Sequence, residues 1–461
     1  MVLVLTVVVL QSIPFSNYAL TTKTTNIIYG SAPYLTFDGG RTRVTNTEAL
    51  LRISLSDGRT FTPTTTNSRD NPIILPVAGQ SFNDIGMLVP RNTNSIALNS
   101  LIRAPYNYWG DDDGDGQGVN GVTATGSLKL SIVDKNGRTV ARNEVLTICD
   151  DKAPYKLTLS NTNGKLKTRY GVPNESRFNA GNATYYINPK AAPEICYARP
   201  NLRYGSGSDA GPANIWNPEK GFLTQSATPS SYGLNFPTTG ANNLYFDLDI
   251  VGNNQALSWA SVSYGGITAT MTNSTSTSVR VTLTGPAVTD PNQWVSENPD
   301  RVGRPSLPQV FELVGRDSSG NAVVKYGFKL KQWFVNRGDY LSNYSNPSSW
   351  CNKIGGYRVP KVKDLTNARY FVSGSIIGAR PSSPGNYYMR YIGGGFFTEW
   401  GHMTDYTGAN FPYNFVFSPL YWTQDRDRLD SLQEFLMVYA GDGTVSFGRN
   451  IADLYGLCVY P

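Results

Sequence analysis

Apolar and polar residues alternate along most of the chain, and this pattern predicts short β-strands. The segment LKLSIVD at 128–134 places an apolar residue at every second position, which is typical of a strand with one buried face. Between 243 and 330, segments of the same kind follow one another at the spacing of a β-sandwich. Asp-Gly and Asn-Gly pairs in TFDGGRT, SLSDGRT, IVDKNGRT and LSNTNGK mark hairpin turns. The sequence therefore predicts a mostly β protein.

The pattern changes twice along the chain, and it predicts three folded parts. We expect a β-rich domain at 20–200 and an immunoglobulin-like β-sandwich at 201–325, which begins with an irregular Gly/Pro/Ser-rich segment. From 326 to 461 the chain is richer in aromatic residues and holds the two best helix candidates, near 361–371 and 427–435. A small α+β domain is expected there. The length of 461 residues agrees with this division at roughly 150 residues per domain.

Residues 2–10 (VLVLTVVVL) form an apolar run that has two interpretations. Its length is that of a signal-peptide core, and small residues up to Ala19 offer a cleavage site, so residues 1–19 would be a secretory signal. No Lys or Arg precedes the run, and its β-branched, partly alternating residues also fit a strand left over from an upstream immunoglobulin-like repeat. Neither this run nor any later segment approaches the ~20 apolar residues of a transmembrane helix, so none is expected in this chain.

Composition and charge exclude several classes of function. The chain has 40 Lys and Arg against 34 Asp and Glu, a net charge of +6, without a dense basic cluster, so a nucleic-acid partner is not expected. His402 is the single histidine, so a histidine-ligated zinc site or a Ser-His-Asp triad would depend on that one residue. No G-x-S-x-G nucleophile motif is present. We expect no catalytic residues and no enzymatic activity, although a pair of distant carboxylates, as in a glycosidase, stays open.

The four cysteines form two groups in the sequence, Cys149 with Cys196 and Cys351 with Cys458. None lies in a C-x-x-C arrangement, so neither a zinc knuckle nor a thioredoxin motif is expected. Of the three possible pairings we favour the sequential one, Cys149–Cys196 and Cys351–Cys458. Two disulfides would place the protein in an oxidising compartment. Four buried free thiols are the alternative.

The acidic run DDDGDGQG at 111–118 is the strongest chemical signal in the sequence. Asp111, Asp113 and Asp115 occupy alternate positions, a glycine is sixth and Gln117 is seventh, which matches the first half of a calcium-binding loop. The glutamate expected at the twelfth position is absent, because Val122 stands there. We expect a calcium ion with a structural role at these four residues. A solvated, metal-free hairpin tip is the alternative.

A second group of candidate residues is aromatic. Trp400, Tyr406, Tyr413 and Trp422 lie in a stretch rich in Gly, Asn and Pro. Aromatic side chains on such loops are the residue types that anchor protein interfaces or stack on sugar rings. We expect these four residues to contribute to receptor binding, with a place in the core of a small domain as the alternative.

The chain resembles the intimin/invasin superfamily of bacterial surface proteins, in particular its invasin-E-type adhesion domain. The resemblance lies in ten segments: APYLTFDGGRT (32–42), YWGDDDGDGQG (108–118), ICDDKAPYKLTLS (148–160), TYYINPKAAPEICYARPNL (184–202), NFPTTGANNLYFDLDI (235–250), YGFKLKQWFVNRG (326–338), SWCNKIGGYRVPKVKDLTNA (349–368), GNYYMRYIGGGFFTEWG (385–401), YWT (421–423) and LCVYP (457–461). It implies a C-type lectin-like fold for the terminal domain at 326–461.

The resemblance also implies a function and a location. Members of this family lie at the tips of outer-membrane adhesins, so we expect an extracellular or cell-surface protein that attaches to a protein or glycan of a host cell. The amino-terminal membrane barrel and the row of immunoglobulin-like repeats of larger relatives have no counterpart in the sequence. The Glu-Pro-Asn motif of calcium-dependent lectins is missing from 331–461, so a sugar ligand is not implied. A secreted carbohydrate-active enzyme, a glycan-binding lectin and an inert remnant of a larger adhesin are the alternatives.

Overall fold

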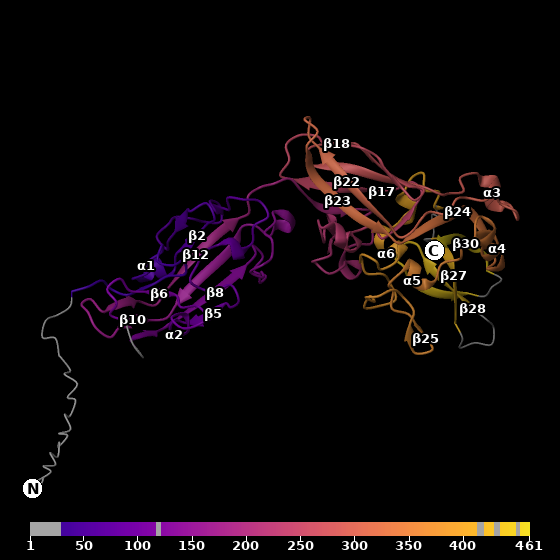
Figure 1. Ribbon diagram of the computed structural model, residues 1–461. Coiled ribbons are helices and arrows are strands. Elements are labelled where there is room, and N and C mark those ends of the chain that lie inside the picture. Colours follow the sequence, from indigo (N-terminus) through magenta and orange to yellow (C-terminus); the bar gives the residue numbers. More distant parts are fainter. Residues whose placement is uncertain (1–28, 117–120, 413–418, 428–433, 449–451) are drawn as a thin grey trace, which may run out of the picture. The chain divides into compact units, whose positions relative to one another are not determined.

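The computed structural model describes residues 29–116, 121–412, 419–427, 434–448 and 452–461 (Figure 1). They form two compact units. A short excursion of the chain, Ile148–Lys152, interrupts the first unit and belongs to the second. The first unit contains residues 29–147 and 153–189, and the second contains Ile148–Lys152 and Lys190–Pro461. None of the helices in the described ranges has the length and hydropathy needed to cross a membrane.

A five-stranded sheet forms the main layer of the first unit. Its strands, in spatial order, are β4 (Ile73–Ile74), β12 (Gly181–Asn188), β9 (Tyr155–Asn161), β8 (Ser127–Val133) and β5 (Ser95–Ala97). All neighbours are antiparallel except β4 and β12. In β8, Leu128, Leu130 and Ile132 are buried and Lys129 and Ser131 are exposed, so the half-buried strand predicted there is confirmed.

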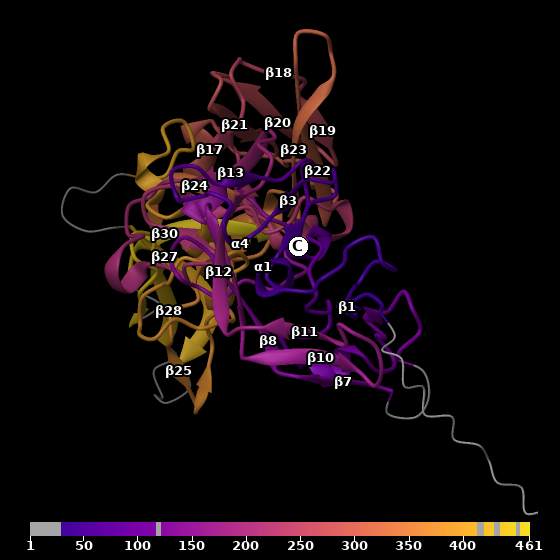
Figure 2. The ribbon, with the colours of Figure 1, turned by 90° about the vertical axis from the view of Figure 1, so that its left-hand side faces the viewer.

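Smaller sheets and two single-turn helices complete the first unit. The sheets are β11 (Glu175–Phe178) with β10 (Gly164–Thr168) and β7 (Val122–Thr125), β1 (Tyr34–Leu35) with β6 (Trp109–Gly110), and β2 (Ile53–Ser54) with β3 (Thr60–Phe61). The helices are α1 (Thr47–Leu50) and α2 (Leu98–Leu101). Figure 2 shows β7, β10 and β11 side by side. Gly164 of the Asn163-Gly164 pair begins β10, but β9 pairs with β8 and β12 and β10 pairs with β7 and β11, so the chain turns there from one sheet to another and the hairpin predicted at this pair is not formed.

The second unit begins with two packed sheets. The larger contains β14 (Trp216–Asn217), β15 (Gly221–Leu223), β13 (Glu194–Arg199), β17 (Leu244–Val251), β21 (Ser278–Thr284), β20 (Ile267–Thr272) and β19 (Val262–Tyr264). The smaller contains β18 (Ser258–Trp259), β22 (Gln309–Arg316) and β23 (Ala322–Leu330). Phe246 of β17 meets Phe328 of β23 edge to face, with ring centroids 6.0 Å apart. The two sheets therefore form a β-sandwich, as predicted for this part of the chain.

A six-stranded sheet follows, with short helices around it. Its strands are β16 (Thr239–Ala241), β24 (Gln332–Ser342), β30 (Leu454–Tyr460), β27 (Leu420–Asp427), β28 (Glu434–Tyr439) and β29 (Val445–Gly448). The helices are α3 (Pro291–Val295), α4 (Ser345–Lys353), α5 (Val362–Leu365) and α6 (Phe396–Trp400), and a hairpin is formed by β25 (Phe371–Val372) and β26 (Ser375–Ile376). The mostly β fold class is confirmed, and this terminal part is α+β as expected.

The expected boundary between residues 325 and 326 is not where the structure divides. It falls inside β23, and one continuous hydrophobic core runs from Ile195 to Val459 through both the sandwich and the six-stranded sheet. Strand β16, which precedes β23 by some eighty residues in the chain, pairs with β24 and so belongs to the terminal sheet. Residues 190–461 therefore fold as one unit. The predicted boundary near residue 200 lies close to the observed one at 189/190.

The two predicted terminal helices need correction. Near 361–371 only Val362–Leu365 is helical, because Thr366 adopts an extended conformation (φ −149°, ψ 152°) and the chain continues to β25. Near 427–435, Asp427 ends β27 and Glu434 begins β28, so both ends of the predicted helix lie in strands. Residues 428–433 lie outside the described ranges.

Candidate functional site

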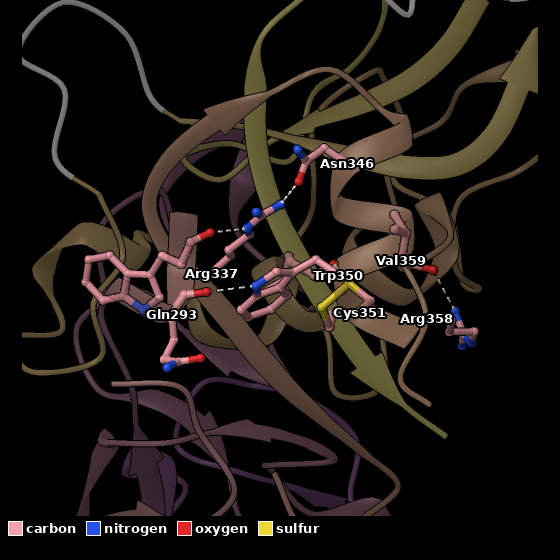
Figure 3. Close-up of a disulfide and its surroundings, with 10 residues drawn as sticks. Gln293, Arg337, Asn346, Trp350, Cys351, Arg358 and Val359 are labelled. Carbon is pink, nitrogen blue, oxygen red and sulfur yellow. Dashed lines mark hydrogen bonds between the residues drawn. A yellow bond between two sulfur atoms is a disulfide. The ribbon is translucent and has the colours of Figure 1, made fainter. Parts of the chain in front are cut away.

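Both predicted disulfides are present. The Cα atoms of Cys149 and Cys196 are 5.3 Å apart, those of Cys351 and Cys458 are 5.4 Å apart, and no cysteine is free. The prediction of sequential pairing is thus confirmed. Cys351 on α4 and Cys458 on β30 are both fully buried, so this bridge joins the first long helix of the terminal part to the last strand (Figure 3).

The second disulfide lies beside the buried side chains of Arg337 and Trp350 (Figure 3). Arg337 is buried there and donates from Nε to the Trp294 carbonyl at 2.7 Å and from Nη1 to Asn346 Oδ1 at 2.6 Å. Its guanidinium lies 5.0 Å from the ring of Trp350, whose indole N–H donates to the Gln293 carbonyl at 3.0 Å. Burial lowers the pKa of Arg337 to about 10. These contacts indicate a structural role for the bridge.

The aromatic residues predicted to bind a receptor are core residues. Trp400 and Trp422 have no exposed surface and Tyr406 is 3% exposed. Each polar atom has a partner: the Trp400 indole donates to the Thr239 carbonyl at 3.1 Å, the Tyr406 hydroxyl to the Trp400 carbonyl at 2.8 Å, and the Trp422 indole to the Ser342 carbonyl at 2.8 Å. Aromatic groups buried in this way stabilise the fold and leave no surface for a partner. The prediction is wrong for these three, and Tyr413 lies outside the described residues.

Glu399 on α6 is a buried carboxylate that holds two distant segments together. It accepts hydrogen bonds from the backbone N–H and the hydroxyl of both Thr238 and Thr239, at 2.6 to 3.2 Å, and from the Gly393 N–H at 2.7 Å. Burial raises the pKa of Glu399, and these donors oppose that shift. Because all of the donors belong to the scaffold, the carboxylate anchors α6 to the start of β16.

The exposed aromatic residues of the terminal part are ones that the sequence patterns did not select. Phe371 on β25 is 51% exposed and Phe447 on β29 is 53% exposed. Phe371 lies on a hairpin whose turn residues, Ser373 and Gly374, both have positive φ angles, and this hairpin projects from the unit (Figure 1). The Val-Ser-Gly-Ser sequence at 372–375 is a turn signal that would have placed Phe371 at a hairpin rather than in a helix.

One loop links the two segments that bear these phenylalanines. The Arg369 N–H donates to the Gly385 carbonyl at 2.7 Å, just before the hairpin. The Asn386 side chain bonds both backbone groups of Val445 on β29, at 2.8 and 2.9 Å. The hairpin and the strand therefore flank the same loop. We call residues 369–376, 385–386 and 444–448 the terminal edge.

The backbone groups of Phe447 on β29 point away from the neighbouring strand β28. Asn386 occupies the outward backbone groups of Val445, and outward groups alternate along a strand, so those of Phe447 point the same way. In the described part of the chain, β29 is the last strand of its sheet. The terminal edge thus combines exposed aromatic rings with backbone groups at Phe447 that bond no described residue, the two features by which extended segments are bound at sheet edges.

Three of the predicted calcium-loop residues, Asp111, Asp113 and Asp115, are described, and they lie in one loop of the first unit. Asp111 Oδ2 accepts from the Gly116 N–H at 3.1 Å, and Asp113 Oδ2 accepts from the Ser31 N–H at 2.5 Å. Asp115 is only 6% exposed. Burial and the Asp113 carboxylate raise the pKa of Asp111 and Asp115, whereas the Ser31 N–H lowers the pKa of Asp113. Gln117 lies outside the described residues, and Val122 begins β7.

Cys149, Glu194 and Cys196 also bring potential metal ligands within 4.8 Å of one another. Both sulfur atoms are bonded in the disulfide, so the thiolates that a metal requires are not available. Glu194 Oε1 accepts from the Ile148 N–H at 3.1 Å. This group therefore ties the excursion at 148–152 to β13.

A cavity of about 330 Å³ in the first unit is lined by two arginines and two aromatic rings, Arg91, Arg142, Phe37 and Tyr108. Arg142 Nη1 donates to the carbonyls of Val89 and Pro90, at 3.0 and 2.7 Å, while its Nε is buried without a partner. Burial, together with the charge of Arg91, lowers the pKa of Arg142 to about 10. Arg91 and Arg142 both line this cavity, and neither forms an ion pair with a carboxylate among the described residues. Two unpaired positive charges beside one cavity favour the binding of an anionic ligand.

Comparison with known proteins gives likenesses of structure alone. No protein-family model matches the chain, and no curated protein matches its sequence. The chain is similar in structure to invasin and intimin. For invasin, an integrin-binding bacterial protein, the identity is 14% and the TM-score 0.35, over 74% of this chain and 56% of that one. For a 282-residue carboxy-terminal intimin fragment in complex with the intimin-binding domain of Tir, the values are 12% and 0.34, over 76% and 90%.

A mutant intimin from EHEC O157:H7 is similar at 14% identity and a TM-score of 0.29, over 49% of this chain and 89% of its own. These likenesses are to proteins of the family that the sequence resembles, and the lectin-like character of the terminal part stays a prediction. The chain spans just over half of the invasin structure. At this distance the likeness does not indicate which residues bind a partner.

Proposed function

We propose that this chain is the receptor-binding part of a bacterial surface adhesin, and that it binds a protein on a host cell. The observation that supports the proposal most is the terminal edge, where Phe371 and Phe447 are exposed on two segments fixed to one loop. Large aromatic side chains are the residues that dominate the energy of protein interfaces. The sequence segments that resemble the intimin/invasin adhesion module support the same function.

The hydrogen bonds that join the terminal edge to the rest of the second unit suit this role. The hairpin and β29 are joined to buried elements through Gly385 and Asn386, and the Tyr388 hydroxyl donates to the Gly441 carbonyl at 2.7 Å within the core. A preorganised surface loses little conformational entropy when it binds. The proposed mechanism is therefore recognition by fixed aromatic anchors, without a chemical step and without a catalytic residue.

The two disulfides support an extracellular location, since such bridges persist in oxidising compartments. Association with the outer membrane is part of the proposal and rests on the family resemblance. The partner we propose is a host-cell surface protein, with a calcium ion in the first unit as the one inorganic partner.

The proposal is tested by binding of the purified, oxidised full chain, carrying a fluorescent label, to cultured epithelial cells. We expect saturable binding that falls when the cells are first treated with trypsin and persists after treatment with glycosidases. Absence of saturable binding would contradict adhesion. Binding that survives trypsin but not glycosidases would contradict a protein receptor.

The arginine-lined cavity favours a second candidate function, the binding of an acidic sugar. Its volume of about 330 Å³ accommodates one sugar ring, and Arg91 and Arg142 would pair with a carboxylate while Phe37 and Tyr108 line the wall. Glucuronic acid and N-acetylneuraminic acid serve as probes in saturation-transfer NMR. Arg91→Gln is expected to abolish the transfer seen with the full chain, and transfer that is equal for glucose and the two acids would count against an acidic-sugar site.

A further inference from the structure

One loop of the first unit brings three carboxylates together with a hydroxyl group from a second segment. We propose that Asp111, Asp113 and Asp115 bind a calcium ion there, with the Ser31 hydroxyl as a further ligand. The site lies in the first unit and the terminal edge in the second, so this proposal does not depend on receptor binding.

The three carboxylates belong to one loop, and none of them forms an ion pair with a cationic side chain among the described residues. Asp113 is close enough to both Asp111 and Asp115 to interact with each carboxylate directly. Among the described residues, the one ion pair of the loop joins Arg43 to Asp112, whose other oxygen accepts from the Tyr34 hydroxyl at 3.2 Å. Three negative charges at such short range destabilise a fold unless a cation neutralises them.

Unsatisfied buried oxygen atoms point to the same conclusion independently of the charge. Asp111 Oδ1, Asp115 Oδ2 and the Ser31 hydroxyl are all buried, and none has a hydrogen-bond partner among the described residues. Buried polar atoms are nearly always satisfied, and an unpaired carboxylate oxygen is the costliest exception. A bound cation would supply the partner that these oxygen atoms lack.

Two glycines lie next to the carboxylates and leave space for them. A Cβ atom on Gly171, which has a φ of +89°, would lie 1.6 Å from Asp115 Oδ2, and one on Gly30 would lie 1.6 Å from Asp113 Oδ2. The two glycines are adjacent, because the Gly30 N–H donates to the Val172 carbonyl at 3.1 Å. Both positions must therefore stay free of a side chain for the carboxylates to occupy this site.

The ligand set selects calcium among the common metals. Its atoms are carboxylate and hydroxyl oxygens without nitrogen or sulfur, which are the ligands of hard cations. Calcium accepts six to eight oxygens in a flexible geometry, so water can complete the shell, whereas magnesium demands a near-ideal octahedron. The three carboxylates do not all lie within 4.8 Å of one another, so binding of one ion by all three requires their side chains to move closer together.

The site contains its own spectroscopic reporter. The ring of Trp109 lies against Gly116, since a Cβ atom there would be 2.7 Å from it. Terbium(III) replaces calcium at oxygen sites and emits when a nearby tryptophan is excited. The full, oxidised chain, freed of metals on a chelating resin, is titrated with terbium and then with calcium. We expect sensitised emission that calcium reverses.

Three variants distinguish binding of the metal ion by specific ligands from nonspecific attraction of the ion to an acidic loop. Asp113→Asn and Asp115→Asn are expected to weaken terbium and calcium binding at least tenfold. The matched control Asp112→Asn removes the same charge from the same loop, but its carboxylate belongs to the Arg43 and Tyr34 pair, and it is expected to bind within about twofold of the unchanged chain.

Ser31→Ala tests the site without changing its charge, and it also serves if a carboxylate variant does not fold. It is expected to weaken binding severalfold. The proposal would be overturned by a lack of sensitised emission from the unchanged chain. It would also be overturned by equal losses in the Asp112, Asp113 and Asp115 variants. Equal affinity of Ser31→Ala would remove the hydroxyl from the ligand set.

Discussion

Removal of the Cys351–Cys458 disulfide tests how the terminal part is stabilised. The bridge joins α4 to β30 across a sequence separation of 107 residues. In the chain-entropy model, a loop of that length restricts the unfolded state by about 5 kcal/mol, whereas the 47-residue separation of Cys149 and Cys196 gives about 4 kcal/mol. The double variant Cys351→Ala/Cys458→Ala is therefore expected to lose a large part of the 5–15 kcal/mol that typically separates folded and unfolded states.

Urea denaturation followed by tryptophan fluorescence measures this loss. Trp109 is the single tryptophan of the first unit, and the other seven of the eight lie in the second. The signal therefore reports mainly the unfolding of the second unit. We expect the midpoint to fall strongly in the double variant, and to fall less in Cys149→Ala/Cys196→Ala. A loss below about 1 kcal/mol, or a larger loss from the Cys149/Cys196 variant, would refute the assignment of the Cys351–Cys458 bridge as the main covalent support.

Three further predictions concern buried groups. Burial lowers the pKa of His402 from its usual value of 6.5, so the unfolded chain takes up the proton first as the pH falls. The second unit should therefore lose stability below about pH 6.5. His402→Gln should flatten this pH dependence in thermal unfolding measured at several pH values. Glu399→Ala leaves five scaffold donors facing a cavity and is expected to cost about 3–5 kcal/mol in urea unfolding, with a smaller loss for Glu399→Gln. Calcium at 100 times its Kd is expected to stabilise the first unit by about 2.7 kcal/mol, an effect that Gly171→Ala should remove in calorimetry because its Cβ would displace Asp115.

Local patterns predicted the local structure well. The alternation at 128–134 predicted β8, and the separation of the cysteines into two groups predicted their pairing. The calcium site expected at the acidic run 111–118 stays a prediction.

Features that depend on contacts between distant segments were not predictable in the same way. The indole N–H of Trp400 donates to the carbonyl of Thr239, 161 residues earlier in the chain. The residues near Trp400 in the sequence therefore do not predict that its side chain is buried. The boundary expected at 325 failed for a similar reason, since β16 leaves the sandwich segment to pair with β24. Phe371 was missed because the residues before it favour a helix, which ends at Leu365 when Thr366 becomes extended.

Cell binding by a terminal-edge variant tests the central claim most directly. Phe371→Ser/Phe447→Ser removes both proposed anchors, and Tyr264→Ser, at 50% exposure on β19 of the same unit, is the matched control. Labelled full chains are compared on cultured epithelial cells after circular dichroism has shown equal folding. The account predicts a loss of binding of at least tenfold for the double variant and unchanged binding for the control. Equal binding by all three proteins would contradict the terminal edge as the receptor-binding surface.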